Sequence, residues 1–301
     1  MTTSTSTAVL TANATVRRPS DRSGPRAFVR VLFARRQAQV GGLIVLGLIV
    51  TALFAPVIAP YDPFELRVGP IKEGPSLDFL FGTDDLGRDL FSRMVYGSRI
   101  TLQIGLISVS LALSIGVLIG IVAGYYGRWV DSVLMRFTDV MLAFPGFILA
   151  MAIVSVLGPG LNNAMIAVGL GSFAGFARIV RGSVLSVRET EYVTAARVLG
   201  ATPSRVMRRA VLPNVLAPII VLGSLEFPFA ILTAAALSFL GLGAQPPSPE
   251  WGAQLVDGRN YIRTSPHLVN VPGAAIFLTV LAFNLLGNSL RDVLDPRLRG
   301  R

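Results

Sequence analysis

The placement of charged residues constrains the fold of this chain more than any other feature of its sequence. Three stretches contain no charged residue over 25, 28 and 38 consecutive positions, and further apolar stretches follow toward the C-terminus. About 20 helical residues, each rising about 1.5 Å, cross the roughly 30 Å hydrocarbon core of a bilayer. Charged residues make up 15% of the chain, whereas soluble domains carry about 25%. We therefore predict an all-α membrane protein.

Six transmembrane helices are predicted from these stretches. The 38-residue stretch from Val140 to Ala177 is interrupted by "GPGLNN" at 158–163, so it is predicted to hold two helices joined by a tight turn. Because each half is short, a re-entrant pair is the alternative at this place. In chain order, the predicted spans are residues 37–61, 100–127, about 137–157, 164–181, roughly 217–242, and 272–290.

The basic residues orient the predicted spans, because an excess of lysine and arginine marks the cytoplasmic segments of membrane proteins. If the N-terminus lies in the cytoplasm, 20 of the 27 basic residues are cytoplasmic, and nine acidic residues accompany the seven outer ones. The opposite orientation would reverse this bias. The predicted topology is therefore N-in/C-in, which places the arginine-rich residues 178–209, between spans four and five, in the cytoplasm.

The N-terminal residues 1–36 are predicted to form a flexible, arginine-rich cytoplasmic tail ahead of a transmembrane domain over residues 37–301. The tripeptide "ANA" at 12–14 is similar to a signal-peptide cleavage site. No positive n-region and no continuous apolar core precede it, which argues against a signal peptide. The formal net charge of +10 lies mostly beside apolar stretches, so its predicted partner is the lipid bilayer and not nucleic acid.

Residue counts exclude several kinds of chemistry. The chain has no cysteine, which rules out a thiol nucleophile, a disulfide and a thiolate metal site. The single histidine, His267, argues against a histidine-based metal site or a Ser-His pair. The only lysine, Lys72, is not preceded by glycine, so no P-loop is present to bind ATP. The chain is predicted not to be an enzyme, with no catalytic residue, cofactor or metal of its own.

Two short water-facing helices are predicted within residues 183–213, the cytoplasmic break between spans four and five. Nothing opposes a helix as far as Leu199, and Gly200 suits the position after a helix end, where positive φ is needed. Thr202 and Pro203 then read as an N-cap and a first helical position, because proline has no N–H to lose there. An interfacial linker whose arginines contact lipid headgroups is the alternative interpretation.

The residue pattern of this break resembles the EAA loop of ATP-binding-cassette importer permeases, the coupling helix that fits a groove of the ATPase subunit. "AARVLG" is followed, after eleven residues, by "LP". Thr194 replaces the glutamate and Ala210 the isoleucine of the general pattern, whereas "YVTAARVLGA" and "LPN" match the dipeptide/oligopeptide branch. The resemblance implies that these residues couple the chain to an ATPase: Tyr192, Ala195, Ala196, Gly200, Ala201, Arg205, Leu212 and Pro213.

Two outer stretches resemble the same branch. They are "FGTDDLGRDLFSRMVYGSRITL" (81–102), before span two, and "ALSFLGLGAQPPSPEWG" (236–252), after span five. The resemblance covers about 35–301 and is to the second permease subunit of a peptide/nickel-type importer. It implies a bacterial cytoplasmic (inner) membrane location and alternating access. The implied partners are a homologous second permease, one or two ATP-binding subunits and an extracytoplasmic substrate-binding protein. Peptides are the implied cargo, with a nickel chelate, glutathione or an opine-like compound as alternatives.

The first outer stretch is predicted to be a helix with acidic residues early and arginines, such as Arg93, late, an order that suits the helix dipole. The family implies a surface that contacts the binding protein or helps to close an outer gate. An interfacial helix that only delivers span two is the alternative. The end of the second outer stretch, "GAQPPSPEWG" (243–252), is predicted to be a stiff loop with Trp251 as an interface anchor. The predicted contacts with the binding protein are Asp84, Asp85, Arg88, Asp89 and Trp251.

One acidic residue, Glu226, lies inside predicted span five. A charged side chain near the bilayer centre costs roughly 2.5–3.5 kcal/mol, so it usually faces a bundle interior or water. Glu226 is predicted either to line the translocation path and attract a cationic group of the cargo, or to be a protonated or neighbour-paired carboxyl. Many related permeases carry a glutamate eight residues later, where this chain has Ala234. Arg136 and Asp139, three residues apart, are predicted to pair at the entrance to span three.

Two other classes of function compete with the importer subunit. A proton- or ion-coupled secondary transporter would use Glu226 as its coupling carboxylate, but no inverted repeat is evident in the sequence. A nucleotide requirement for uptake would distinguish the two. An intramembrane hydrolase using Ser172 would lack a base, because His267 falls in an outer loop.

Overall fold

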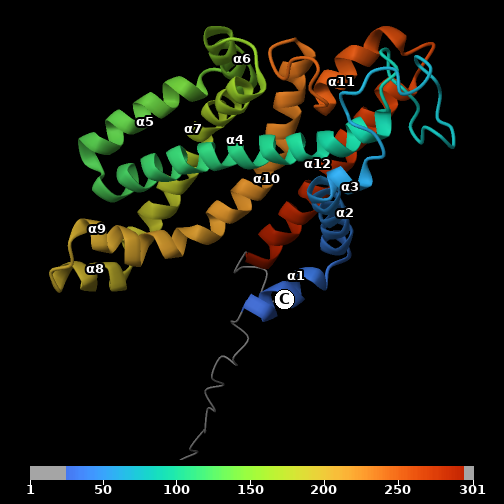
Figure 1. Ribbon diagram of the computed structural model, residues 1–301. Coiled ribbons are helices and arrows are strands. Elements are labelled where there is room, and N and C mark those ends of the chain that lie inside the picture. Colours follow the sequence, from blue (N-terminus) through green and yellow to red (C-terminus); the bar gives the residue numbers. More distant parts are fainter. Residues whose placement is uncertain (1–24, 295–301) are drawn as a thin grey trace, which may run out of the picture.

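The computed structural model describes residues 25–294, with side chains from Val29 onward, and every named element in this part of the chain is a helix (Figure 1). The elements are α1 (Pro25–Phe33), α2 (Arg36–Leu53), α3 (Ala55–Ile58), α4 (Leu90–Tyr126), α5 (Arg128–Leu142), α6 (Gly146–Leu157), α7 (Leu161–Arg188), α8 (Glu191–Val198), α9 (Pro203–Val206), the π-helical η1 (Met207–Val211), α10 (Leu212–Phe239), α11 (Trp251–Gly258), the 3-10 helix η2 (Arg259–Tyr261) and α12 (His267–Leu294).

Five helical segments of the described chain are long and apolar enough to cross a membrane. They are α2, α4, α7, the continuous segment Pro203–Phe239 and α12. A sixth span exists only if the bent pair α5–α6 is counted as one. The fold is therefore all-helical with five or six candidate spans.

The predicted flexible tail is helical where the structure describes it. α1 lies just before α2, and the ring of Phe33 packs against Gly42 at the start of the first span. Arg35, between the two helices, forms an ion pair with Asp292 near the end of α12. These contacts hold residues 25–35 against the membrane domain. The remaining tail residues, 1–24, lie outside the described part of the chain.

The helices α4 and α7 form the closest packed pair of the fold. Gly116, Gly120 and Gly124 recur every fourth residue on α4 and face α7. A Cβ atom at Gly120 would lie 2.7 Å from the backbone oxygen of Ala177 and 2.7 Å from the Cβ of Val180. Glycine at these positions therefore lets the two backbones approach, as small residues do in many membrane helix pairs.

The third predicted span, 137–157, is wrong as a single helix. α5 ends at Leu142, α6 begins at Gly146, and the two meet at an angle of 89°. Pro145 stands at the break, with φ −55° and ψ 130°. Because proline has no backbone N–H, it cannot donate the hydrogen bond that would continue the helix of α5. The predicted turn is confirmed at residues 158–160, and α7 begins at Leu161, within the range predicted for the turn.

The predicted pairing of Arg136 with Asp139 is also wrong. Asp139 instead pairs with Arg178 of α7. One turn along α7, the guanidinium of Arg181 donates to both carboxylate oxygens of Asp131, at 2.5 and 2.6 Å. These pairs hold α5 alongside α7.

The predicted single helix as far as Leu199 is broken, because α7 ends at Arg188 and α8 starts at Glu191. The predicted turn after α8 is confirmed: Gly200 has φ +80°, and Pro203 is the first residue of α9. α9 then continues through η1 into α10 without a separate linker. The candidate span Pro203–Phe239 therefore begins before the predicted span 217–242, at the first residue of α9.

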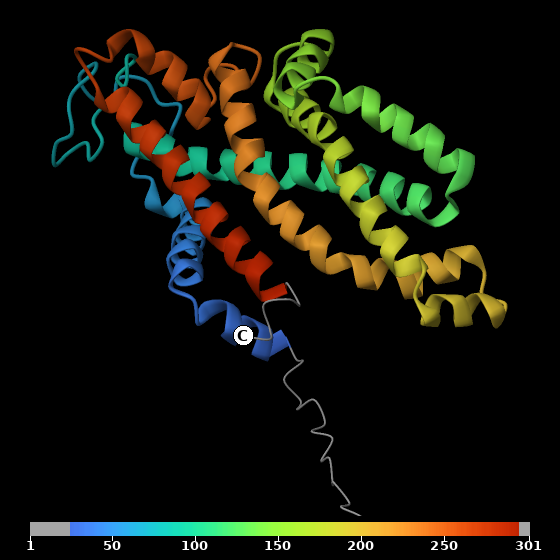
Figure 2. The same cartoon turned by 180° about the vertical axis from the view of Figure 1, so that it is seen from behind.

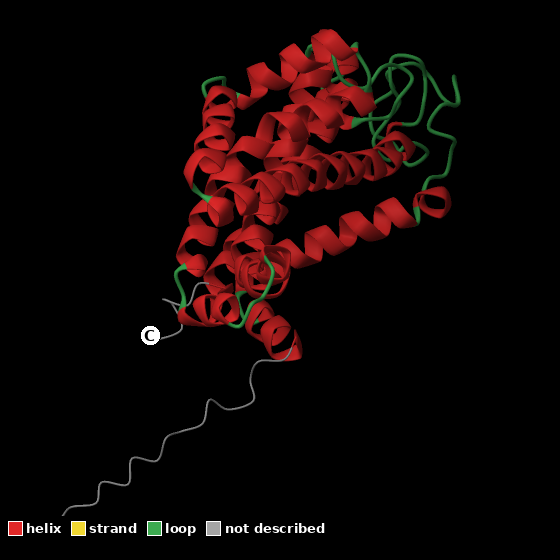
Figure 3. Ribbon diagram, turned by 90° about the vertical axis from the view of Figure 1, so that its left-hand side faces the viewer, coloured by secondary structure: helices red, strands yellow, loops and turns green. Residues whose placement is uncertain are grey.

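The long loops gather at the opposite end of the molecule from α8 and α9 (Figures 1 and 3). Residues 59–89 connect α3 to α4, and residues 240–250 connect α10 to α11. The second loop contains a cis peptide bond between Pro246 and Pro247. Seen from behind, α10 lies between α7 and α12 (Figure 2).

Candidate coupling surface and outer ionic network

The inner side of the α8–α9 loop is a small apolar core. Val193 of α8 is fully buried, and it packs in one cluster with Val184 of α7, Val206 of α9 and Val211 of η1. Three of the residues predicted for ATPase coupling contribute their side chains to this cluster from its edge: Ala196, Ala201 and Leu212. The loop is therefore a packed extension of α7 and α10 and not a free linker.

The solvent-facing side of the same α8–α9 loop presents apolar residues. Val198 is 81% exposed and Leu199 is 86% exposed, at the end of α8. Gly200 follows with positive φ and has nothing within 4 Å of the position where a Cβ would lie. The remaining residues predicted for coupling are also exposed on this loop: Tyr192, Ala195, Arg205 and Pro213. We call the surface formed by Val198, Leu199 and Gly200 the coupling tip.

Val198 and Leu199 were not among the residues predicted to contact an ATPase. Their sequence predicts an apolar face of a longer helix, because they continue its hydrophobic pattern. The helix ends at Val198 instead, so nothing covers them within the described chain. The available signal was their position directly before a glycine that reverses the chain.

A set of contacts ties the α8–α9 loop to the C-terminal end of α4. Arg188, the last residue of α7, donates from Nη1 to the backbone oxygens of Gly124 (3.2 Å) and Tyr125 (3.3 Å). These oxygens belong to the last turn of a helix, where carbonyls lack helical partners. The guanidinium of Arg197, on α8, lies 5.1 Å from the centre of the Tyr125 ring. The α8–α9 loop is thus in contact with three long helices, α4, α7 and α10.

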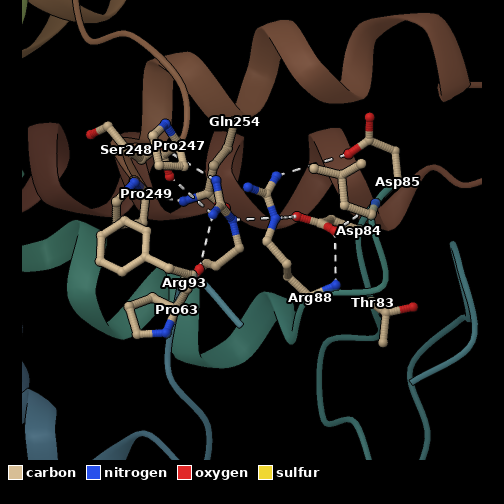
Figure 4. Close-up of polar contacts among 12 residues, drawn as sticks. Pro63, Thr83, Asp84, Asp85, Arg88, Arg93, Pro247, Ser248, Pro249 and Gln254 are labelled. Atoms are coloured by element: carbon tan, nitrogen blue, oxygen red, sulfur yellow. Dashed lines mark hydrogen bonds and ion pairs between the residues drawn. The ribbon is translucent and has the colours of Figure 1, made fainter. Parts of the chain in front are cut away.

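At the opposite end of the molecule, buried charges join the outer loops to α4 (Figure 4). Asp84 accepts from Arg88 Nε at 2.5 Å, and Arg93 Nε lies 3.5 Å from the same carboxylate. Arg93 is only 1% exposed. Its other nitrogens donate to the backbone oxygens of Pro63 (3.0 Å), Pro247 (3.3 Å) and Ser248 (3.4 Å). One guanidinium therefore holds α4 and both long outer loops.

The helix predicted around these charges begins later than expected. Asp84 and Asp85 precede α4 in a turn, and Asp89 is its N-cap, accepting from the backbone N–H of Ser92 at 2.7 Å. Arg93 lies in the first turn of α4 and not late in the helix, so the predicted match to the helix dipole is wrong. Its ion pair and carbonyl contacts hold it there.

Most residues predicted to contact a binding protein have partners inside this chain. Asp84, Arg88, Asp89 and Trp251 are each less than 7% exposed. The indole N–H of Trp251 donates to the backbone oxygen of Met94 at 3.1 Å, so Trp251 is buried against α4 and is not an exposed interface anchor. Direct contact of these residues with a binding protein stays a prediction.

Glu226 lies in the middle of α10, where it is partly buried, with Ser172 of α7 close to its carboxyl group. A cavity of about 490 Å³ opens on an adjacent face of α10, lined by Leu222 and Leu225 but not by Glu226. Arg291 of α12 lines its other side. Both predicted roles of Glu226, in the translocation path and as a neighbour-paired carboxyl, stay predictions.

The arrangement defines a multi-pass helical membrane protein whose ordered surfaces lie at its two ends. Its fold is similar to a chain of the methionine ABC transporter MetNI in an inward-facing conformation, with a TM-score of 0.54 over 67% of this chain and 96% of that one. The identity is 20%, so the likeness concerns the fold alone.

Residues 116–300 match the family model described as the binding-protein-dependent transport system inner membrane component, and residues 26–75 match the N-terminal transmembrane domain of oligopeptide transport permease C. The chain belongs to this family of transport components. It is a multi-pass inner membrane permease subunit of an ATP-binding-cassette importer, in which partner subunits hydrolyse ATP. The family therefore argues against the secondary transporter and the hydrolase.

Relatives with assigned names cover almost the whole chain. The dipeptide transport system permease protein DppC of Alkalihalophilus pseudofirmus is 47% identical over 91% of this chain and 90% of its own length. The di/tripeptide permease DppC of Pseudomonas aeruginosa is 48% identical over 89% and 90%. The glutathione transport system permease GsiD of Pectobacterium atrosepticum is 45% identical over 94% and 95%.

Proposed function

We propose that this chain forms half of the path of an importer for small peptides, together with a homologous second permease. The names of its relatives support this class of cargo, because they include dipeptides, di- and tripeptides and glutathione. All of these carry a free amino group, at least one free carboxylate and an amide backbone. An extracytoplasmic binding protein would deliver the cargo, and ATP-binding subunits in the cytoplasm would drive its passage.

The observation that carries the proposed coupling role is the exposed apolar tip at Val198 and Leu199. A soluble surface with two neighbouring aliphatic side chains more than 80% exposed is expected to be covered by a partner. The tip stands on a packed base formed by Val193 and its neighbours, so it is already ordered before a partner binds. Ordering in advance lowers the entropic cost of docking.

Motion at the coupling tip has two routes into the membrane domain. Through Val193 and Val206 it reaches α7 and the continuous helix that includes α10. Through Arg188 and Arg197 it reaches the end of α4. Closure of the ATP-binding subunits would thus move three candidate spans together and alternate access to the path. Because α4 and α7 are packed through glycines, they are expected to move as one body.

The coupling proposal is tested with the permease pair and its ATP-binding subunits in nanodiscs. Leu199→Glu places a charge on the exposed tip without disturbing the core beneath it. We expect loss of ATPase co-purification or at least a tenfold loss of ATP-dependent uptake, with normal membrane insertion. Arg208→Gln and Arg209→Gln, on the exposed side of η1, are the contrast. A headgroup-binding linker would show the reverse, tolerating Leu199→Glu and failing when both arginines are replaced.

The cargo class is tested by uptake into proteoliposomes that contain the complete transporter. Labelled dipeptide, tripeptide and glutathione are each supplied with the same binding protein, and the other two, unlabelled, serve as competitors. ATP-dependent accumulation of at least one of them supports the proposal. Uptake of a nickel chelate or an opine-like compound, with none of the three peptides accumulated, would replace it.

The proposed topology has six spans with both ends in the cytoplasm, the pair α5–α6 counting as one span. Because the chain has no cysteine, single cysteines report the sidedness of each loop. Ser186, near the end of α7, and Thr264, between α11 and α12, are both exposed. An impermeant maleimide applied to intact spheroplasts is expected to label Thr264→Cys and to spare Ser186→Cys until the membrane is opened. Labelling of both from outside would refute the topology.

A further inference from the structure

The outer loop between α3 and α4 carries a cluster of exposed aliphatic side chains that the described chain leaves uncovered. Leu77 is 99% exposed, the highest value among the large apolar residues of the described chain, and Leu80 and Ile71 are 57% and 54% exposed. They lie within residues 70–83 of the loop. We call this segment the outer knob.

The backbone of the outer knob is held in one conformation by internal hydrogen bonds. The backbone N–H of Thr83 donates to the oxygen of Glu73 at 3.0 Å, and the N–H of Glu73 donates to the Thr83 hydroxyl at 3.0 Å. The N–H of Ser76 donates to the oxygen of Phe79 at 2.8 Å, and the Ser76 hydroxyl accepts from the N–H of Phe79 at 3.1 Å. This closes a tight turn with Leu77 at its apex.

The two faces of this turn differ sharply. Phe79 is 7% exposed, and its ring stacks on Tyr61 with centroids 5.8 Å apart. It also covers Gly69, where a Cβ would lie 2.4 Å from the ring. Phe79 therefore anchors the turn from below, while Leu77 points away from the protein. The aliphatic residue is displayed on a rigid support, as in protein interfaces that are organised before binding.

The outer knob is in contact with the outer ends of the helices. The backbone N–H of Lys72 donates to the oxygen of Asp84 at 2.9 Å, and Asp84 binds Arg93 at the start of α4. The Lys72 ammonium lies 4.2 Å from the centre of the Tyr261 ring. At the start of α12, His267 Nε2 lies 3.3 Å from the backbone oxygen of Thr83. A partner that binds the knob would thus act on α4 and α12 together.

The charge around the knob indicates which kind of partner fits it. Residues 62–83 contain four acidic residues and two basic ones, and the ammonium of one of the basic residues, Lys72, lies over the Tyr261 ring. Asp78, next to Leu77, is exposed. Negative charge disfavours anionic lipid headgroups. It favours a protein with an apolar pocket and a basic rim.

We propose that the outer knob is the docking site of this permease for the extracytoplasmic binding protein, with Leu77 as the central anchor and Leu80 beside it. The inference rests on the proposed function, because it requires that cargo arrives on such a protein. It places the contact on aliphatic residues of the loop and not on Asp84, Arg88, Asp89 or Trp251, which are buried. Those residues connect the knob to the helices.

The test measures binding of the purified, cargo-loaded binding protein of the same transport system to the complete transporter in nanodiscs. Leu77→Asp is expected to weaken the affinity at least tenfold, and Leu80→Ser about threefold. Ile262→Ser is the matched control, because Ile262 is 55% exposed on another outer loop, and it is expected to change the affinity less than twofold. Basal ATPase activity and melting temperature should not change in any variant, since all three side chains lie on the surface.

Wild-type affinity in Leu77→Asp would overturn the inference while leaving the proposed function intact. Loss of the second permease from purified Leu77→Asp complexes would also overturn it and would assign the knob to that subunit. A wild-type transporter that ignores every loaded binding protein would instead refute the proposed function itself.

Discussion

The guanidinium of Arg93 lies 3.5 Å from the carboxylate of Asp84, and both side chains are buried at the outer end of α4. The same guanidinium donates to backbone oxygens of two loops that are more than 150 residues apart in sequence. Three segments of the outer end therefore depend on one side chain. Removing it would leave the buried Asp84 carboxylate with Arg88 as its remaining ion-pair partner and would leave three carbonyls without this donor.

Replacing Arg93 by methionine keeps much of the volume and removes these contacts. Breaking a buried ion pair from one side costs about 3 kcal/mol, which lowers the melting temperature in detergent by roughly 6–12 °C. Arg263→Met, on an exposed outer loop, should change it by less than about 2 °C. In the double variant Asp84→Asn/Arg93→Met the loss should be smaller than the sum of the two single losses. Strict additivity would show that the two residues do not interact.

The packing of α4 on α7 makes a second prediction. A Cβ at Gly120 would lie 2.7 Å from two atoms of α7, so Gly120→Ala should force the helices apart and destabilise the protein by about 1–3 kcal/mol. Gly47 of α2 has nothing within 4 Å of its Cβ position. Gly47→Ala should therefore be neutral or stabilise the helix by up to about 1 kcal/mol. Thermal unfolding in detergent compares the two, and equal effects would contradict the close approach.

The contact of Arg188 with the end of α4 predicts an uncoupled variant. Arg188→Gln shortens the side chain and removes its charge, so the backbone oxygens of Gly124 and Tyr125 lose their donor. We expect assembly and basal ATPase activity to remain, while stimulation of ATPase by loaded binding protein falls at least fivefold. Arg178→Gln, which breaks an exposed pair with Asp139, should retain most of the stimulation. A similar response of both variants would mean that α4 receives no motion through Arg188.

Acid pH is predicted to stabilise the fold through carboxyl groups at its outer end. Burial raises the pKa of Asp257 above its ordinary value, the charge of Asp85 raises it further, and Arg93 and Arg88 oppose the shift. Burial raises the pKa of Glu250 as well, although two backbone N–H groups that it accepts from oppose this. A carboxyl whose pKa is higher in the folded state stabilises the fold below its unfolded pKa, and this contribution is lost as pH rises through the folded pKa.

Asp257→Asn removes this titration. At pH 8 the variant should melt at a higher temperature than the wild type, and this difference should shrink as the pH falls and the wild-type carboxyl takes up its proton. Asp78→Asn, on the exposed knob, serves as the control. A melting temperature lowered at pH 8 would show that Asp257 is held by its arginines more strongly than burial disfavours it.

The two predicted roles of Glu226 are separated by Glu226→Gln, which keeps a hydrogen-bonding group toward Ser172. If the carboxylate lines the path, uptake of lysine-containing dipeptides should fall severalfold relative to glutamate-containing ones, because an attraction for cationic cargo is lost. Ser172→Ala tests the pairing alone and should leave this ratio unchanged. Equal uptake of both cargoes by Glu226→Gln, at the wild-type rate, would leave Glu226 a structural role only.

The sequence by itself determined the features that depend only on residues close together along the chain. Uncharged stretches predicted where most spans lie, because transfer of a helix into the bilayer depends on its own side chains. Gly200 and Pro203 predicted the reversal between α8 and α9, because positive φ and a missing N–H are local properties. The motifs at residues 183–213 and in the outer stretches also predicted the family to which the chain belongs.

The remaining features were decided by tertiary contacts. Asp84, Asp85 and Asp89 read as the start of a helix, yet only Asp89 caps α4, and Arg93 joins Asp84 to backbone oxygens of loops that are distant in sequence. α7 ends at Arg188, where the side chain meets the carbonyls of α4 instead of continuing to Leu199. Hydropathy also cannot tell whether Leu199 or Leu77 will be covered, since exposure depends on what the fold brings against a residue. The tertiary packing of the chain therefore decides which apolar residues are buried in the core and which are left exposed for binding.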